Sequence, residues 1–101
     1  TALSGSGPAF IAFFIEAMVE GGIKSGLSKE NASELAIQTL LGTASLLETG
    51  MPPEKLREMV TSPGGTTAAG LKVFEEKGFK NIVLSAIDAA VKRAEELGRK
   101  E

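Results

Sequence analysis

Apolar residues recur every three or four positions along this chain, in segments separated by glycine and proline. This spacing is typical of α-helices with one apolar face. No segment alternates with period two for long enough to indicate a strand. The pattern predicts five helices, over residues 8–25, 28–50, 53–60, 63–77 and 81–97. The predicted fold class is all-α, a helical bundle.

Residues at the ends of these segments support the predicted boundaries. Ser28 is a good N-cap, and Pro8 and Pro63 suit a first helical turn because the N–H group that proline lacks would have no helical partner there. Gly78 lies where a helix ends in left-handed geometry. Phe79 directly after it is placed for a hydrophobic contact back to the last turn of that helix.

The helix predicted over residues 8–25 is apolar on two faces. A helix of this kind is buried on both faces, and a chain of 101 residues has little interior in which to bury it. We therefore expect a second chain to cover one face. The first stripe is Phe10, Phe13, Phe14, Ala17 and Gly21, and the second is Ile11, Ile15 and Met18.

Composition narrows the possible functions. The chain has no Cys and no His, which excludes disulfides, thiolate or imidazole metal sites and histidine-dependent catalysis. The net charge is −2, and no basic patch with interleaved aromatics points to nucleic acid. The longest apolar run, residues 8–15, is shorter than the ~20 residues of a membrane span. We expect a soluble, cytoplasmic chain with no membrane partner. Because it begins at Thr1 without Met, we also expect a fragment.

The segment of residues 61–67 is the strongest candidate for chemistry. Two glycines in a first helical turn cost helix stability, but they let a ligand reach the backbone N–H groups. Those N–H groups carry the positive end of the helix dipole, so they can bind a carboxylate or a phosphate. A capped turn where two helices pack closely at glycine explains the same residues without a ligand. The candidate binding residues are Ser62, Gly64, Gly65, Thr66 and Thr67.

Two other features have simpler interpretations. Residues 4–9 hold two Gly-Ser pairs before Pro8, and a flexible hinge explains them better than an anion site. They do not match the dinucleotide fingerprint in spacing, and no strand precedes them. Glu16 and Glu20 are four residues apart on one helix, where a solvated polar stripe is a better interpretation than a catalytic pair.

Several of these motifs, in this order, resemble the C-terminal domain of pyrroline-5-carboxylate reductases. The matching stretches cover residues 4–10, 21–27, 38–42 and 56–71, and the resemblance extends over essentially the whole chain. It implies that an N-terminal Rossmann domain, absent from this chain, precedes the helical domain. It also implies that two helical domains interlock into a homodimer, with higher oligomers in some members.

The resemblance implies an activity and a role for the segment of residues 61–67. The reaction is reduction of 1-pyrroline-5-carboxylate to L-proline by hydride from NADPH or NADH. Backbone N–H groups from Gly64 to Thr67 would bind the substrate carboxylate, and the Thr67 hydroxyl would lie near the ring nitrogen as the catalytic group. Ser62 would shape the loop. Met59 stands where relatives often carry an amide that touches the cofactor, so a polar contact there is in doubt.

The cofactor would be bound mainly by the absent domain, so we expect the chain alone to be inactive. Two alternatives remain open at this point. One is a dimerisation module with no activity. The other is the helical domain of a related dehydrogenase that acts on another acid.

Overall fold

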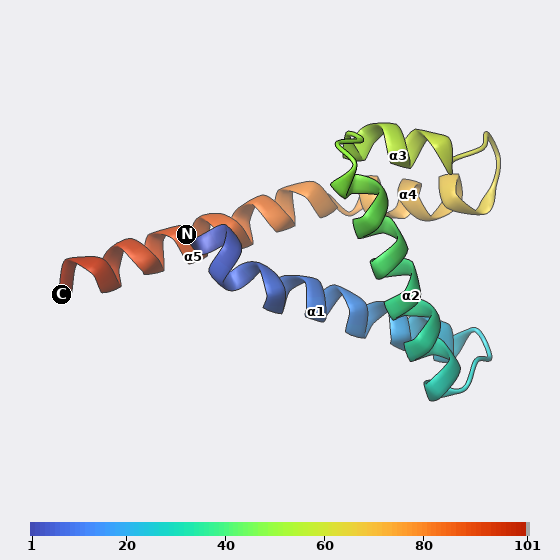
Figure 1. The fold of residues 1–101 in the computed structure, drawn as a ribbon, viewed down its shortest axis with the longest axis horizontal. Coiled ribbons are helices and arrows are strands. Elements are labelled where there is room, and N and C mark those ends of the chain that lie inside the picture. The colour runs from blue at the N-terminus through green and yellow to red at the C-terminus, as the bar shows by residue number, and fades with distance from the viewer. Residues whose placement is uncertain (101) are drawn as a thin grey trace. The chain divides into compact units, whose positions relative to one another are not determined.

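Five α-helices make up the described chain, and residues 1–100 contain no strand (Figure 1). The computed structural model describes the backbone of residues 1–100 and the side chains of residues 1–98. The predicted all-α fold is confirmed. The helices are α1 (Ala2–Lys24), α2 (Lys29–Glu48), α3 (Pro53–Met59), α4 (Thr66–Glu76) and α5 (Phe79–Lys100).

The chain divides into two compact units. The first contains Thr1–Pro8 and the chain from Val60 onward, and therefore holds α4 and α5. The second is Ala9–Met59, which holds most of α1 with α2 and α3.

In the Ala9–Met59 unit, α1 and α2 approach each other closely at one glycine. The Ser28 hydroxyl accepts a hydrogen bond from the Asn31 N–H at 3.1 Å, which confirms the predicted N-cap of α2. Ala32, one helical turn after Ser28, lies so close to Gly22 of α1 that a Cβ built on the glycine would be 3.0 Å from the Ala32 Cβ. Ala32 and Ala36 are the only buried hydrophobic residues among those described, at 3% and 5% exposure.

In the other unit, α4 and α5 join at the glycine stop predicted from the sequence. Gly78 has φ +71°, and its N–H donates to the Glu75 carbonyl at 3.2 Å. The rings of Phe74 and Phe79 lie 4.7 Å apart between centroids. The expected hydrophobic contact of Phe79 with the last turn of the preceding helix is therefore confirmed.

The start of the first helix was predicted wrongly. α1 begins at Ala2, and Pro8 lies inside it, so residues 4–7 are helical instead of a hinge. Hydrogen bonds between Thr1 and Ser4 hold the first turn, including Ser4 N–H to the Thr1 hydroxyl at 3.4 Å. Proline disfavours helix at the preceding residue partly through that residue's Cβ. Gly7 has no Cβ, so this part of the clash is absent.

By length and composition alone, α1 is suited to cross a membrane. The sequence argument counted only the uncharged run of residues 8–15, whereas α1 extends it with Leu3 on one side and with Met18 and Val19 beyond Glu16 on the other. An apolar helix of a soluble protein meets the same criterion when another subunit covers it, so the criterion does not distinguish the two cases.

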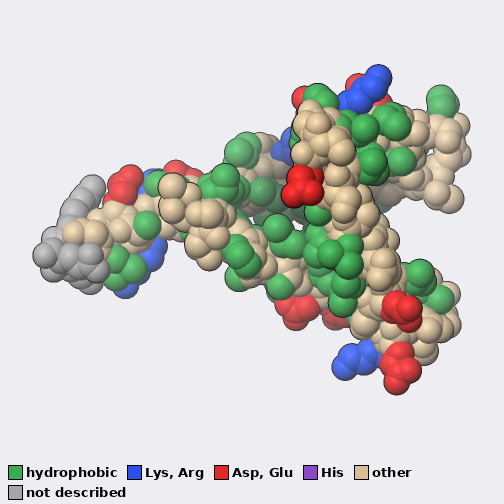
Figure 2. Space-filling model, viewed as in Figure 1, with side chains coloured by type: hydrophobic (Ala, Val, Ile, Leu, Met, Phe, Trp, Pro, Cys, Tyr) green, Lys and Arg blue, Asp and Glu red, His purple; other side chains and the backbone are tan. Residues whose placement is uncertain are grey.

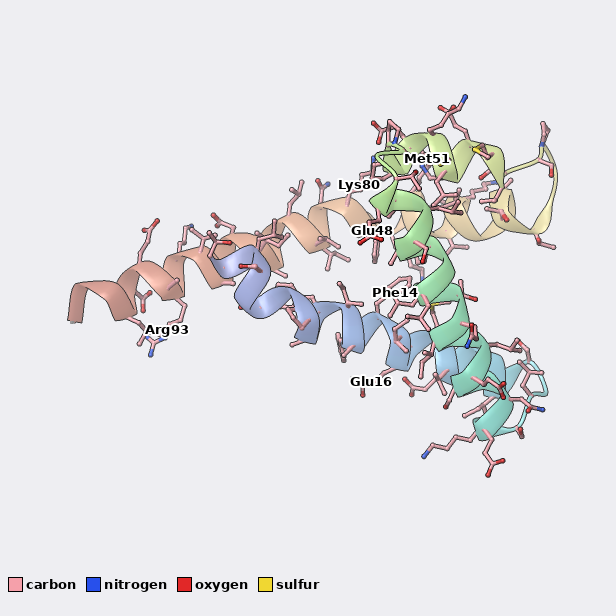
Figure 3. All side chains as sticks on the ribbon, in the orientation of Figure 1. Phe14, Glu16, Glu48, Met51, Lys80 and Arg93 are labelled. Carbon is pink, nitrogen blue, oxygen red and sulfur yellow. The ribbon has the colours of Figure 1, made fainter. Side chains whose placement is uncertain are left out.

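Large hydrophobic side chains are exposed on every helix (Figure 2). Phe13, which belongs to the first predicted stripe of α1, is the most exposed of them at 75%. Phe14 and Glu16 leave α1 on opposite sides, as expected for residues two positions apart on a helix (Figure 3).

Candidate functional site

The predicted binding segment forms a tight turn followed by the start of α4. The Gly65 N–H donates to the Ser62 carbonyl at 3.0 Å, which closes a four-residue turn. Pro63 and Gly64 are its central residues, and Gly64 has φ +74°. Proline followed by a glycine with positive φ is typical of a type II turn.

Ser62 is not the N-cap that the sequence suggested, and Pro63 is not in the helix. The N-cap is Gly65, with φ −87° and ψ −177°, and no side chain caps α4. The N-cap lies three residues later than predicted, because the Ser62 carbonyl accepts the hydrogen bond of the turn and Pro63 lies within the turn, before the helix. A Cβ on Gly65 would lie 3.2 Å from that carbonyl oxygen, so the turn also favours glycine at this position.

The first turn of α4 therefore presents open backbone donors. Helical hydrogen bonding begins with the Ala69 N–H, which donates to the Gly65 carbonyl at 3.2 Å. The N–H groups of Thr66, Thr67 and Ala68 precede it and have no helical partner. With the helix dipole, they provide an electropositive site suited to a carboxylate or phosphate.

The threonine side chains lie at the same end of α4. Thr66 is exposed and Thr67 is half-buried. Both follow directly after the turn, so their hydroxyls can add a donor or acceptor near an anion held by the N–H groups. The structure thus brings the turn residues Ser62, Gly64 and Gly65 together with both threonines.

The remaining sequence candidates lie on other helices. Met59 is the last residue of α3, and its side chain is 62% exposed. Residues 4–7 lie within α1 and form no loop. Glu16 and Glu20 are exposed on α1, as expected for a solvated stripe. What the sequence reasoning missed was the turn, although the Pro-Gly pair is a recognised signal for one.

The described residues contain no nicotinamide-cofactor site of the Rossmann type. Dinucleotide sites of the Rossmann type need a glycine-rich turn between a strand and a helix. Residues 1–100 contain no strand, and the Gly-Ser repeat of residues 4–7 is helical. Residues 1–100 therefore contain no dinucleotide turn of the Rossmann type, whereas the start of α4 is suited to an anion.

Comparison with protein families gives one match, over residues 1–97, to the family described as pyrroline-5-carboxylate reductase dimerisation. The chain is 50% identical to pyrroline-5-carboxylate reductase from Synechocystis sp. over 101 residues, which cover 99% of the chain and 38% of that protein. It is also 50% identical to pyrroline-5-carboxylate reductase 3 from Macaca fascicularis, covering 99% of the chain and 37% of the relative. The chain therefore spans less than two fifths of the length of these relatives.

Solved structures give the same result. The chain matches Plasmodium falciparum pyrroline carboxylate reductase with NADP bound at a TM-score of 0.92 and 38% identity, covering 97% of the chain and 40% of that protein. A pyrroline-5-carboxylate reductase from Coxiella burnetii matches at 0.90 and 48%, covering 95% and 36%. By the match of residues 1–97 and these similarities, the chain belongs to the pyrroline-5-carboxylate reductase dimerisation family.

Proposed function

We propose that this chain is the C-terminal domain of an oxidoreductase that reduces 1-pyrroline-5-carboxylate to L-proline, in proline biosynthesis. Its contribution is dimerisation and the binding of the substrate carboxylate. The observation that carries this proposal is the glycine turn of residues 62–65, which leads into the uncapped start of α4. The family supplies the identity of the anion.

The carboxylate of the substrate is the group that this helix start would hold. Its oxygens would accept hydrogen bonds from the open N–H groups of Thr66 and Thr67, while the Gly65 N–H, which was also expected to bind it, already donates to the Ser62 carbonyl. Such bonds to a charged acceptor contribute about 1.5–3 kcal/mol each. Because the carboxylate is fixed to the substrate ring, holding it also fixes the position of the carbon–nitrogen double bond.

We assign the Thr67 side chain a role at the substrate ring itself. Its hydroxyl lies on the same first turn of α4 as the open N–H groups, and we assign it to the ring nitrogen. In the reaction, hydride adds to the imine carbon, and the nitrogen of the protonated imine becomes the amine of proline. A hydroxyl at that nitrogen orients the ring and needs no histidine, which this chain lacks.

The cofactor, NADPH or NADH, supplies the hydride and would be held by a Rossmann domain N-terminal to this chain. The P. falciparum relative binds NADP, while the choice of cofactor here belongs to that other domain. Met59 is the last residue of α3 and comes shortly before the turn in sequence. We assign its side chain at most an apolar contact with the cofactor. The purified 101-residue chain is expected to show no reductase activity.

We further propose that the working protein is a soluble, cytoplasmic homodimer, or a higher oligomer built from dimers. The family's dimerisation role supports the dimer, and so do the exposed apolar side chains of α1. Covering α1 with a partner explains its apolar length without a membrane.

The test is kinetic and uses the full-length protein. Thr67→Ala should lower kcat/KM for 1-pyrroline-5-carboxylate by roughly ten- to a hundredfold, the equivalent of one hydrogen bond to a charged group. Thr67→Ser keeps the hydroxyl and should retain most of the activity. The KM for NADPH should stay unchanged in both variants. Unaltered turnover in Thr67→Ala would remove Thr67 from the site.

Two other functions predict different outcomes. A dimerisation module without activity predicts that the full-length protein reduces no imino acid. A dehydrogenase for another acid predicts activity with that acid and none with 1-pyrroline-5-carboxylate. A panel of cyclic imino acids assayed with both cofactors separates the three.

A further inference from the structure

We propose that Met59 is a modification site, at which oxidation to methionine sulfoxide by a peroxide weakens the binding of the nicotinamide cofactor. The accessibility of the side chain and its place at the end of α3 carry the site itself. The effect on the cofactor rests on the proposed function, which gives Met59 an apolar contact with that cofactor.

The composition of the chain restricts oxidation to methionine. The chain contains no Cys, His, Trp or Tyr, and its three methionines are Met18, Met51 and Met59. A peroxide therefore meets one class of readily oxidised side chain in these 101 residues. A thioether needs no neighbouring base to react, so the access of the peroxide to the sulfur decides which methionine reacts first.

Met59 is the most accessible of the three methionines. It is 62% exposed, whereas Met18 is 37% exposed. Met51 is half-buried in the connection between α2 and α3 (Figure 3). Met18 also belongs to the second apolar stripe of α1, which a second copy covers in the proposed dimer. We therefore expect Met59 to react before the other two.

The place of Met59 at the end of α3 explains its exposure. Helical side chains lean toward the N-terminus of their helix, so each residue is partly covered by side chains of the following turn. α3 ends at Met59, and residues 60–65 are not helical. Val60, the next residue, is itself 59% exposed. No following helical turn therefore shields the Met59 sulfur.

The reaction transfers one oxygen atom to the Met59 sulfur. A sulfur lone pair attacks one oxygen of hydrogen peroxide, so that the S–O bond forms as the O–O bond breaks. The other oxygen leaves as water after proton transfer, and the peroxide gains the two electrons that sulfur loses. A polar sulfoxide replaces the apolar thioether, and methionine sulfoxide reductases return the thioether.

A sulfoxide at Met59 opposes the proposed contact with the cofactor. Its oxygen is a hydrogen-bond acceptor, and an apolar surface that covers it removes its water without a replacement. We expect the KM for NADPH to rise roughly five- to tenfold. The KM for 1-pyrroline-5-carboxylate should not change, because its binding is assigned to residues 62–67. Bound cofactor would shield Met59 in turn, so the cofactor-free enzyme is the form that is oxidised.

Peptide mass mapping of the full-length protein during exposure to hydrogen peroxide tests the site. Met59 should gain oxygen faster than Met18 and Met51 by about threefold or more, and saturating NADP⁺ should slow the reaction at Met59. A rate at Met59 that does not exceed the other two overturns the modification site, and a rate that ignores NADP⁺ overturns the link to the cofactor. The mapping needs no turnover, so it remains decisive if the proposed reductase activity fails.

A matched pair of variants tests the effect on the cofactor. Met59→Leu keeps an apolar side chain of similar volume that peroxide does not oxidise, and Met18→Leu is the control. After the same treatment, the KM for NADPH should rise in the unaltered protein and in Met18→Leu, and it should keep its untreated value in Met59→Leu. A methionine sulfoxide reductase should reverse the rise. An equal rise in Met59→Leu would place the effect on other residues and overturn the inference.

Discussion

At the scale of single residues, Gly64 decides the geometry of the candidate site. Its φ of +74° lets the chain reverse between Pro63 and Gly65, so that α4 starts at Thr66. The sequence pointed to these residues as a candidate anion site, because glycines leave the backbone N–H groups open and hydroxyls add hydrogen-bonding groups. It did not give the geometry, because two local preferences competed. Ser62 is a good cap and Pro63 a good first helical residue, but the Pro-Gly pair forms a turn instead.

Gly64→Ala should destabilise the protein by about 1–2 kcal/mol, because a Cβ is unfavourable at positive φ. Gly64→Asn should cost less, since asparagine tolerates left-handed geometry. Thermal or urea unfolding of both variants measures the difference. Alanine tolerated as well as asparagine would contradict the turn described here.

At the scale of helices, the sequence predicted the helix ends that depend on interactions between neighbouring residues. The N-cap at Ser28 and the stop at Gly78 each depend on residues within one turn, and both were predicted correctly. The start of α1 was not, because Pro8 inside a helix runs against the usual preference. In the structure, hydrogen bonds between Thr1 and Ser4 close the first turn, and Gly7 lacks the Cβ that would clash with Pro8.

Ser28→Ala should cost about 1 kcal/mol, because the Asn31 N–H loses its acceptor. Ser45→Ala is the control, since Ser45 is an exposed residue within the same helix and alanine has the higher helix propensity. Ser28→Ala should therefore lower the free energy of unfolding by at least about 0.5 kcal/mol more than Ser45→Ala does, and Ser45→Ala should leave it unchanged or raise it. Equal losses would indicate that the cap does not stabilise α2.

The junction of α4 and α5 gives a pairwise prediction. A double-mutant cycle with Phe74→Leu and Phe79→Leu should yield a coupling of about 0.5–1.5 kcal/mol, as expected for rings in contact. The cycle isolates the ring contact, because leucine keeps most of the apolar volume. A coupling near zero would mean that the two rings stabilise the junction independently.

At the scale of the whole molecule, the chain is best understood as a part of a larger assembly. The apolar stripes of α1 predicted a partner from the sequence alone, and all of their residues except the half-buried Ile15 are exposed in the structure. The proposed anion site also depends on groups outside this chain, because neither the substrate ring nor the hydride donor belongs to it.

Sedimentation equilibrium of the 101-residue chain at about 10 µM tests the central claim most directly. Two copies that complete each other's core predict a helical species of twice the chain mass of 10.5 kDa. A stable, helical species of 10.5 kDa at that concentration would contradict the account.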